Sequence, residues 1–167
     1  VACFRERAAA SASTLDDVAS EREVPAAVAR FLAAHRIEGR GCVWPTLAAL
    51  DWAGAGLSLE ARAVRGEDAV GVTGVFCAVA ETGTLCVLSA RDAPASASLV
   101  PETHVAVVPA GRIVACMEDA WDLLRAECGG LPRAVNFISG PSRTADIEQT
   151  VVLGAHGPAR VHVVIVG

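Results

Sequence analysis

The 167-residue chain contains no lysine and no tyrosine, so all 14 of its basic side chains are arginines. A Schiff base, a pyridoxal-phosphate linkage, a phosphate-loop NTPase site and a kinase-type ATP site each depend on a lysine ε-amino group. The lack of lysine therefore excludes these chemistries. The lack of tyrosine excludes a phenolic acid or base.

The chain also lacks a basic face and a long apolar run. Its formal net charge is −5 and its arginines are scattered singly, which argues against binding to a phosphate backbone. The longest uncharged stretch, Ala69 to Ala80, has twelve residues, whereas a membrane-spanning helix needs roughly 18 or more. The opening residues contain no apolar signal core. We expect one cytoplasmic α/β domain over residues 1–167, whose segment 1–23 is helical or poorly ordered and truncated at its start.

The six cysteines include no CxxC pair, and no HxH or HxxxH spacing suggests a metal site. We interpret them as reduced thiols of the core. Cys77 and Cys86 flank an expected hairpin and can lie close together, which leaves both a structural and a redox role open.

Helix and strand patterns alternate in the first half of the chain. An apolar rhythm predicts a helix from Val24, with Pro25 in its first turn and Gly39 just past its end. A short apolar run follows over 41–44, then a second short helix over 45–52 and an extended segment over 57–64. This order favours a mostly parallel sheet covered by helices.

The second half of the chain contains most of the expected strands. Residues 69–90 are strand-like on both sides of Thr82-Gly83, where a hairpin needs a positive φ. A helix of about 14 residues, ending near Cys128, is predicted from apolar residues at helical spacing. Three continuous apolar runs are expected to be central strands of a single sheet, namely Ala134 to Ser139, His104 to Pro109 and Val161 to Val166.

The densest polar stretch of this half, GPSRTADIEQT, occupies residues 140–150. Ser142 or Thr144 can cap a short helical turn there, and free amides together with the Arg143 guanidinium suit a phosphate or carboxylate. We expect this anion site to lie at the edge of the sheet, close to Glu81. The alternative is a structural loop.

If residues 140–150 form a structural loop, Arg143 pairs with Asp146 or Glu148. His156, in the turn GAHGP, is either a proton carrier or a loop residue. His104 and His162 lie within strand patterns, which is typical of hydrogen-bonded core histidines.

The second candidate site is AETGT at residues 80–84. An acidic side chain between apolar strands needs a partner or has its pKa raised. Glu81 is therefore either a functional carboxylate or a hairpin residue bonded to nearby amides.

Three segments together resemble a known family: DAVGVTGVFCAVAETGTLCVLSA, HVAVVP and GLPRAVNFISGPSRTADIEQTVVLGAHGPARVHVVIVG. They are similar to the lactate-utilisation protein C family, or LUD-domain proteins, over about Asp68 to Gly167. The first 65 residues match only as a pattern of helix and strand. The chain is shorter than typical family members.

The resemblance implies a three-layer α/β/α sandwich with a mostly parallel central sheet, like those of ribose-5-phosphate isomerase A, glucosamine-6-phosphate deaminase and the coenzyme A transferases. It also implies a role beside iron-sulfur partner proteins in oxidising L-lactate to pyruvate. Because this chain has no cluster-binding cysteine motif, it is expected to be a non-redox subunit.

The family motifs carry over onto particular residues of this chain. The first motif supplies Glu81, Thr82, Gly83 and Thr84; the second supplies Ser142, Arg143, Thr144, Asp146, Glu148, His156 and Gly157. Coenzyme A transferases use a glutamate in a Ser-Glu-x-Gly turn to form an acyl intermediate, and Ala80-Glu81-Thr82-Gly83 is similar to that turn. An anchoring role for Glu81, at the hairpin tip or on Arg143, is the alternative.

Three classes of function follow. The first is a subunit of a lactate-oxidising system that binds a small anion or a partner through the two motifs. The second is a free-standing enzyme acting on a coenzyme A thioester, a phosphosugar or a folate, although the lack of lysine counts against pentose-isomerase and cyclo-ligase chemistry. The third is a regulatory or structural interaction protein, and fold alone does not separate the three. The sequence identifies no cofactor.

Overall fold

The computed structural model describes residues 1–147, 150–154 and 156–167. Three α-helices lie in this part of the chain: α1 (Ala2–Ala10), α2 (Val24–Ala34) and α3 (Met117–Glu127). Four short 3-10 helices accompany them: η1 (Glu21–Glu23), η2 (Pro45–Leu47), η3 (Ala95–Ser98) and η4 (Ala110–Arg112). Each helix of the described residues is too short or too polar to cross a membrane.

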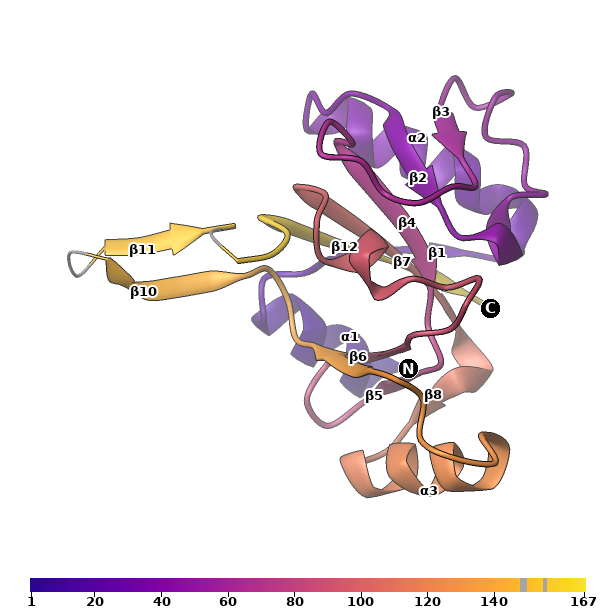
Figure 1. Ribbon diagram of the computed structural model, residues 1–167, viewed down its shortest axis with the longest axis vertical. Helices are drawn as coiled ribbons and strands as arrows, with labels where there is room; N and C mark the ends of the chain where they lie inside the picture. Colours follow the sequence, from indigo (N-terminus) through magenta and orange to yellow (C-terminus); the bar gives the residue numbers. More distant parts are fainter. Residues whose placement is uncertain (148–149, 155) are drawn as a thin grey trace.

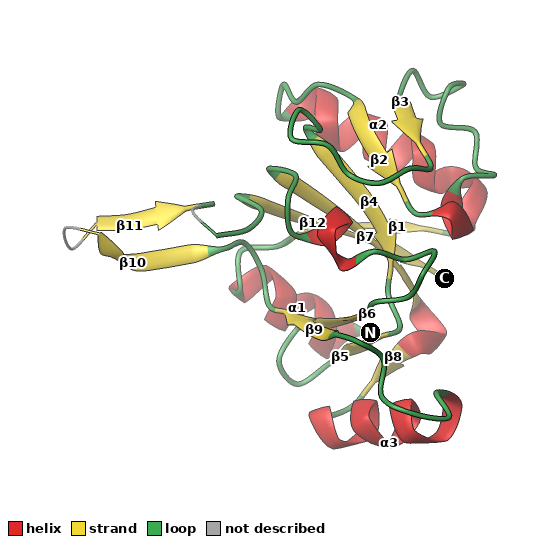
Figure 2. Cartoon of the chain, in the orientation of Figure 1, coloured by secondary structure: helices red, strands yellow, loops and turns green. Residues whose placement is uncertain are grey.

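Six parallel strands form the central sheet, in the order β1-β12-β7-β4-β2-β3 (Figures 1 and 2). They are β1 (Thr14–Val18), β2 (Arg40–Val43), β3 (Ser58–Glu60), β4 (Val70–Gly74), β7 (Thr103–Pro109) and β12 (Arg160–Val166). The valine-rich runs of β4, β7 and β12 are almost wholly buried, as expected for parallel strands covered on both faces.

Different layers cover the two faces of this sheet. Val72, Val107 and Val164 pack with α2 in one apolar cluster, and Ala106, Val108 and Val163 pack with α1 in another. Since Cβ atoms alternate along a strand, neighbouring residues of β7 contribute to opposite layers. The arrangement is the predicted three-layer α/β/α sandwich.

A smaller sheet lies beside α1, in the order β8-β5-β6-β9. Its strands are β5 (Cys77–Val79), β6 (Thr84–Leu88), β8 (Ile113–Val114) and β9 (Val135–Ile138). Figure 1 shows α3 on the outside of this sheet, away from the central one. Val79, Cys86 and Phe137 pack beneath α3.

Two expectations about these elements are wrong. The segment containing β9 is not a strand of the central sheet, because it pairs antiparallel with β6. An apolar run indicates that both faces of a strand are covered. Both faces of the small sheet are covered too, so the run of β9 did not identify the sheet to which it belongs. The expected helix of about 14 residues begins only at Met117, because Ile113 and Val114 pair with β5.

Two predicted segments of the first half are shorter than expected. The helix expected over 45–52 is a single 3-10 turn, and the extended segment expected over 57–64 is a strand only over Ser58–Glu60. The helix from Val24 is confirmed, with Pro25 in its first turn, but it ends at Ala34 and not next to Gly39 as expected.

A long antiparallel hairpin projects from the body of the molecule (Figure 1). It consists of β10 (Arg143–Ile147) and β11 (Thr150–Leu153). The GPSRTADIE motif thus begins at the base of an arm.

Candidate functional site

The first motif forms the turn between β5 and β6. The amide of Gly83 donates to the carbonyl of Val79 at 3.0 Å, and Gly83 has a φ of +67°. This confirms the expected positive φ at Gly83. A side-chain carbon there would also collide with the backbone of α1 at Arg7 and Ala8. The turn therefore needs glycine both for its conformation and for contact with α1.

Glu81 in this turn is bonded to the start of α3. Its carboxylate Oε1 accepts a hydrogen bond from the amide of Met117 at 3.0 Å, and its own amide donates to the carbonyl of Ala115 at 3.1 Å. The amides of a first helical turn lack partners within the helix and favour negative charge. The side chain is exposed, so it does not have the dry pocket that a carboxylate nucleophile needs. This geometry supports the anchoring role.

Three hydroxyl groups form a chain on the α3 side of the small sheet. Thr84 Oγ1 donates to Thr82 Oγ1 at 2.8 Å and lies 2.7 Å from Ser139 Oγ. Because Thr84 has one hydroxyl hydrogen, Ser139 is the donor of the second bond. Thr84 is buried, whereas Thr82 and Ser139 are exposed. The chain thus ends on an exposed Thr82 hydroxyl that can donate to a ligand.

The second motif starts where this chain of hydroxyls ends. Ser139 precedes Gly140, which has a φ of +78° and packs against the carbonyl of Ser11. The expectation of a helical turn capped by Ser142 or Thr144 is wrong, because β10 begins at Arg143 and continues as an extended strand paired with β11. The hydrogen bonds between β10 and β11 use the backbone N–H and C=O groups that a helical turn would need.

The base of the arm is held by the two parts of the second motif. The amide of Ser142 donates to the carbonyl of Pro158 at 2.8 Å, so it is not free for an anion. The carbonyl of Ser142 accepts from the amide of Gly154 at 3.0 Å. Gly157 faces the Ser142 side chain, with its Cβ position 3.3 Å from Ser142 Cβ. The GPS and GAHGP segments are therefore neighbours in space.

The remaining residues of this motif are spread over the arm and its base. Arg143 and His156 are exposed, and Thr144 and Asp146 belong to β10. Glu148 lies outside the described residues. The structure thus joins the two motifs through Thr84 and Ser139, while Glu81 is bonded to α3.

The strand histidines are buried, and each bonds a threonine. His104 Nε2 lies 2.8 Å from Thr73 Oγ1, and His162 Nδ1 lies 2.9 Å from Thr14 Oγ1. The His162 ring stacks on Phe31 with 3.9 Å between ring centroids. Burial lowers the pKa of both histidines to about 4. Their placement in the core is confirmed, but only one nitrogen of each ring is bonded: His104 Nδ1 and His162 Nε2 are buried and have no hydrogen-bond partner among the described residues.

Cys77 and Cys86 are directly opposite each other on β5 and β6, as their spacing predicted. Both are fully buried free thiols. Their mutual hydrogen bond lowers the pKa of Cys77 and raises that of Cys86. They pack under α3, which supports a structural role.

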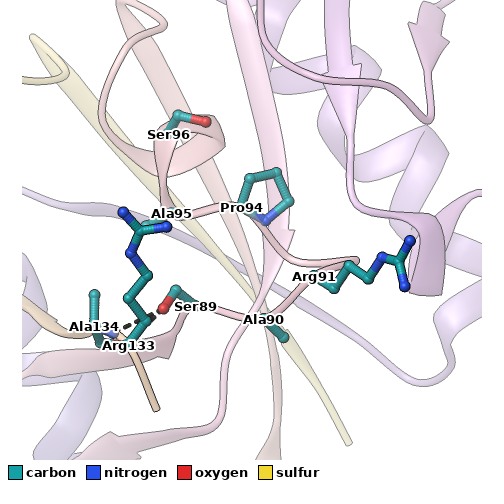
Figure 3. Close-up of a pocket in the computed structure, with 8 residues that line it drawn as sticks. All are labelled: Ser89, Ala90, Arg91, Pro94, Ala95, Ser96, Arg133 and Ala134. Carbon is teal, nitrogen blue, oxygen red and sulfur yellow. Dashed lines mark hydrogen bonds between the residues drawn. The ribbon is translucent and has the colours of Figure 1, made fainter.

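A pocket that the sequence patterns do not reveal lies between the loop after β6 and the entrance to β9 (Figure 3). Its lining includes Ser89, Arg91, Ser96 and Arg133. The two segments are about forty residues apart in the chain, and each carries a single arginine. The only sequence signal is a loop broken by Pro94.

The fold and the two motifs agree with the comparison against protein families. The model of the LUD domain matches residues 47–166, so the chain belongs to the LUD-domain family. Among solved structures, a DUF162 family protein from Deinococcus radiodurans has the same fold, with a TM-score of 0.73 and 23% sequence identity. That likeness covers 99% of this chain and 95% of the other.

The curated relatives carry a more particular name. Lactate utilization protein C of Bacillus subtilis (strain 168) is 39% identical over 100 residues, which are 58% of this chain and 42% of the relative. Lactate utilization protein C of Bacillus licheniformis is 34% identical over 127 residues, 74% of this chain and 53% of the relative. The chain thus spans about half the length of the curated relatives that it matches.

Proposed function

We propose that this chain acts in an L-lactate utilisation system as a non-redox subunit that binds a small organic anion through its two motifs. The relatives named lactate utilization protein C support the pathway. The contact between Thr84 and Ser139 carries the assignment of the site, because it joins the ETGT turn to the segment that leads into GPSR.

The chemistry of the two motifs suits a 2-hydroxy or 2-oxo acid. The Arg143 guanidinium offers two parallel donors to a carboxylate, and the Thr82 hydroxyl offers a donor to a second oxygen. The carboxylate of Glu81 is held at α3 and keeps the ETGT turn in place. In this proposal Glu81 positions the site and does not attack the ligand.

The binding test is calorimetry with L-lactate and pyruvate. Arg143→Ala removes the guanidinium, and Thr84→Val removes the buried hydroxyl at nearly constant volume. Loss of a bidentate charged contact weakens binding roughly tenfold or more. Arg125→Ala is the control, because Arg125 is an exposed arginine on α3 that pairs with Asp122. Equal affinity in all four proteins, or no binding of either acid, would refute the assigned site.

The assembly test concerns iron-sulfur partners. The described cysteines are all free thiols and contain no CxxC pair, so electron transfer is assigned to other subunits. The tagged protein purified from lactate-grown cells is expected to bring iron and acid-labile sulfide with it in stoichiometric amount. Recovery of the protein alone with a bound small molecule would instead favour a free-standing enzyme.

A further inference from the structure

We propose that the pocket beside Arg133 is a second ligand site, which binds an organic anion through a carboxylate or phosphate group. The pocket has a volume of about 700 Å³ and lies between residues 89–96 and the segment that enters β9. It is separate from the ETGT and GPSR motifs, neither of which contributes to its lining. The inference therefore does not rest on the proposed function.

Hydrogen bonds hold one wall of the pocket in place. Ser89 Oγ accepts from the amide of Ala134 at 2.8 Å and donates to the carbonyl of Ala134 at 3.3 Å. The amide of Ser89 also donates to the carbonyl of Ala134 at 3.0 Å. Three bonds thus tie the end of β6 to the entrance of β9.

The opposite wall is fixed to the central sheet. Trp44, which follows β2, donates its indole N–H to the carbonyl of Pro94 at 3.3 Å. η3 lies so close to β4 that a side-chain carbon at Gly71 would collide with the carbonyl of Ala97. A ligand therefore meets walls that are already positioned, which reduces the entropy that binding costs.

The charges of the lining favour an anion. The lining contains two arginines and no acidic side chain. Figure 3 shows the Arg133 guanidinium beside Ala95, whereas Arg91 extends away on the other side of Pro94. Among the salt bridges of the described residues, none involves either arginine. Arg133 is the cation placed to bind a ligand, whereas Arg91 also lines a neighbouring pocket together with Asp92.

An unpaired buried donor lies on the strand that adjoins the pocket. Asn136 follows Ala134 by two residues and so lies on the same face of the extended segment. Its Nδ2 is buried and has no acceptor in the described part of the chain. Such groups normally have a partner, because an unpaired buried donor is costly. Asn136 does not line the pocket, so the assignment of the ligand class rests on Arg133 and on the absence of acidic side chains from the lining.

The non-ionic part of the ligand is expected to be apolar and larger than lactate. Ala90, Pro94, Ala95 and Ala134 supply apolar wall, and the volume exceeds that of a three-carbon acid several times. The recognised group is therefore the anionic end of an organic molecule. A carboxylate and a phosphate share this chemistry and are separated by experiment.

The test compares phenyl phosphate, benzoate and benzyl alcohol, which share one ring and differ in the charged group. Calorimetry with the whole chain is expected to show binding of one or both anions and none of the alcohol. Arg133→Gln should weaken that binding roughly tenfold or more, as loss of a charged bidentate contact does. The preferred anion identifies the ligand as a phosphate or a carboxylate.

Matched variants make the result decisive. Arg125→Gln, on α3, and Arg22→Gln, in η1, should leave binding of the aromatic anions unchanged, because both residues are exposed arginines outside the proposed sites. If these variants weaken it as much as Arg133→Gln does, binding is general attraction to surface charge and the proposal is wrong. It is also wrong if neither anion binds, if benzyl alcohol binds as tightly, or if Arg133→Gln has no effect. A circular-dichroism melt checks that each variant is folded.

Discussion

The carboxylate of Glu81 accepts a hydrogen bond from the amide of Met117, so the acidic residue of the ETGT turn caps the first turn of α3 from another element. The N-cap position itself is occupied by Cys116, whose thiol is a weaker acceptor than a carboxylate. Glu81 thus links the β5–β6 turn to the helix that covers the small sheet. Because of this contact, loss of the Glu81 side chain has a structural effect on α3. Variants must distinguish this effect from any chemical role of the carboxylate.

Glu81→Ala is expected to lower the free energy of unfolding by about 1 kcal/mol, the usual cost of losing a helix cap. Glu81→Gln retains the acceptor oxygen and should cost less than half as much. Urea unfolding measures both. Lactate-dependent growth supported by Glu81→Gln is expected to equal that of the wild type. A folded Glu81→Gln protein that fails to support growth would show that the charge itself is needed, and mass spectrometry for a glutamyl adduct would follow.

Gly83→Ala is expected to destabilise the chain by roughly 1–3 kcal/mol, because a left-handed conformation and a collision with α1 combine at this position. Gly66→Ala is the control, since a side-chain carbon at Gly66 meets open space. The midpoint of urea unfolding should fall for Gly83→Ala and stay close to wild type for the control. Equal midpoints would contradict the tight packing of α1 on this turn.

The central sheet could be predicted because its strands have a simple signature. The runs that became β7 and β12 are apolar at nearly every position, which only a strand covered on both faces requires. The same signature led to the wrong prediction that β9 belongs to the central sheet. Apolar residues show that both faces of a strand are covered, but they do not identify the neighbouring strand. Pairing of β9 with β6 depends on contacts between segments about fifty residues apart.

The candidate sites were predictable to different degrees. The glycine of ETGT marked its turn, since positive φ leaves a local signal at Gly83. The arm was missed because Ser142 and Thr144 suit a helix cap and a strand alike, and pairing between β10 and β11 decided the outcome. The pocket beside Arg133 has no local signal, because folding alone brings its two walls together.

The hydroxyl chain is expected to behave as a coupled unit. Thr84→Val removes both of its hydrogen bonds and should cost about 1–2 kcal/mol of stability, because the site is buried. Ser139→Ala should cost less, since Ser139 is exposed. In a double-mutant cycle by urea unfolding, the two changes should be non-additive by roughly 0.5–1 kcal/mol. Strict additivity would mean that the two hydroxyls do not interact in solution.

The buried histidines are expected to make folding sensitive to mild acid. The folded-state pKa values of His104 and His162 are about 4, below the ordinary value of 6.5. Between these limits the unfolded chain binds protons that the folded chain does not, so stability is complete above pH 6.5 and falls as the pH drops toward 4. At pH 5 each histidine should account for a loss of about 2 kcal/mol.

His162→Phe tests this origin of the acid sensitivity. Phenylalanine keeps a ring against Phe31 but cannot titrate, and it gives up the bond to Thr14. The wild type is expected to lose stability between pH 7.5 and pH 5, and His162→Phe should lose about half as much, because one of two titrating sites is gone. This comparison does not depend on the stability of the variant at pH 7.5. Burial is the main cause of the lowered pKa of His162, because the charges of nearby Asp16 and Arg30 shift that pKa in opposite directions. Urea unfolding across this range provides the measurement, and a wild-type slope in His162→Phe would assign the acid sensitivity to other groups.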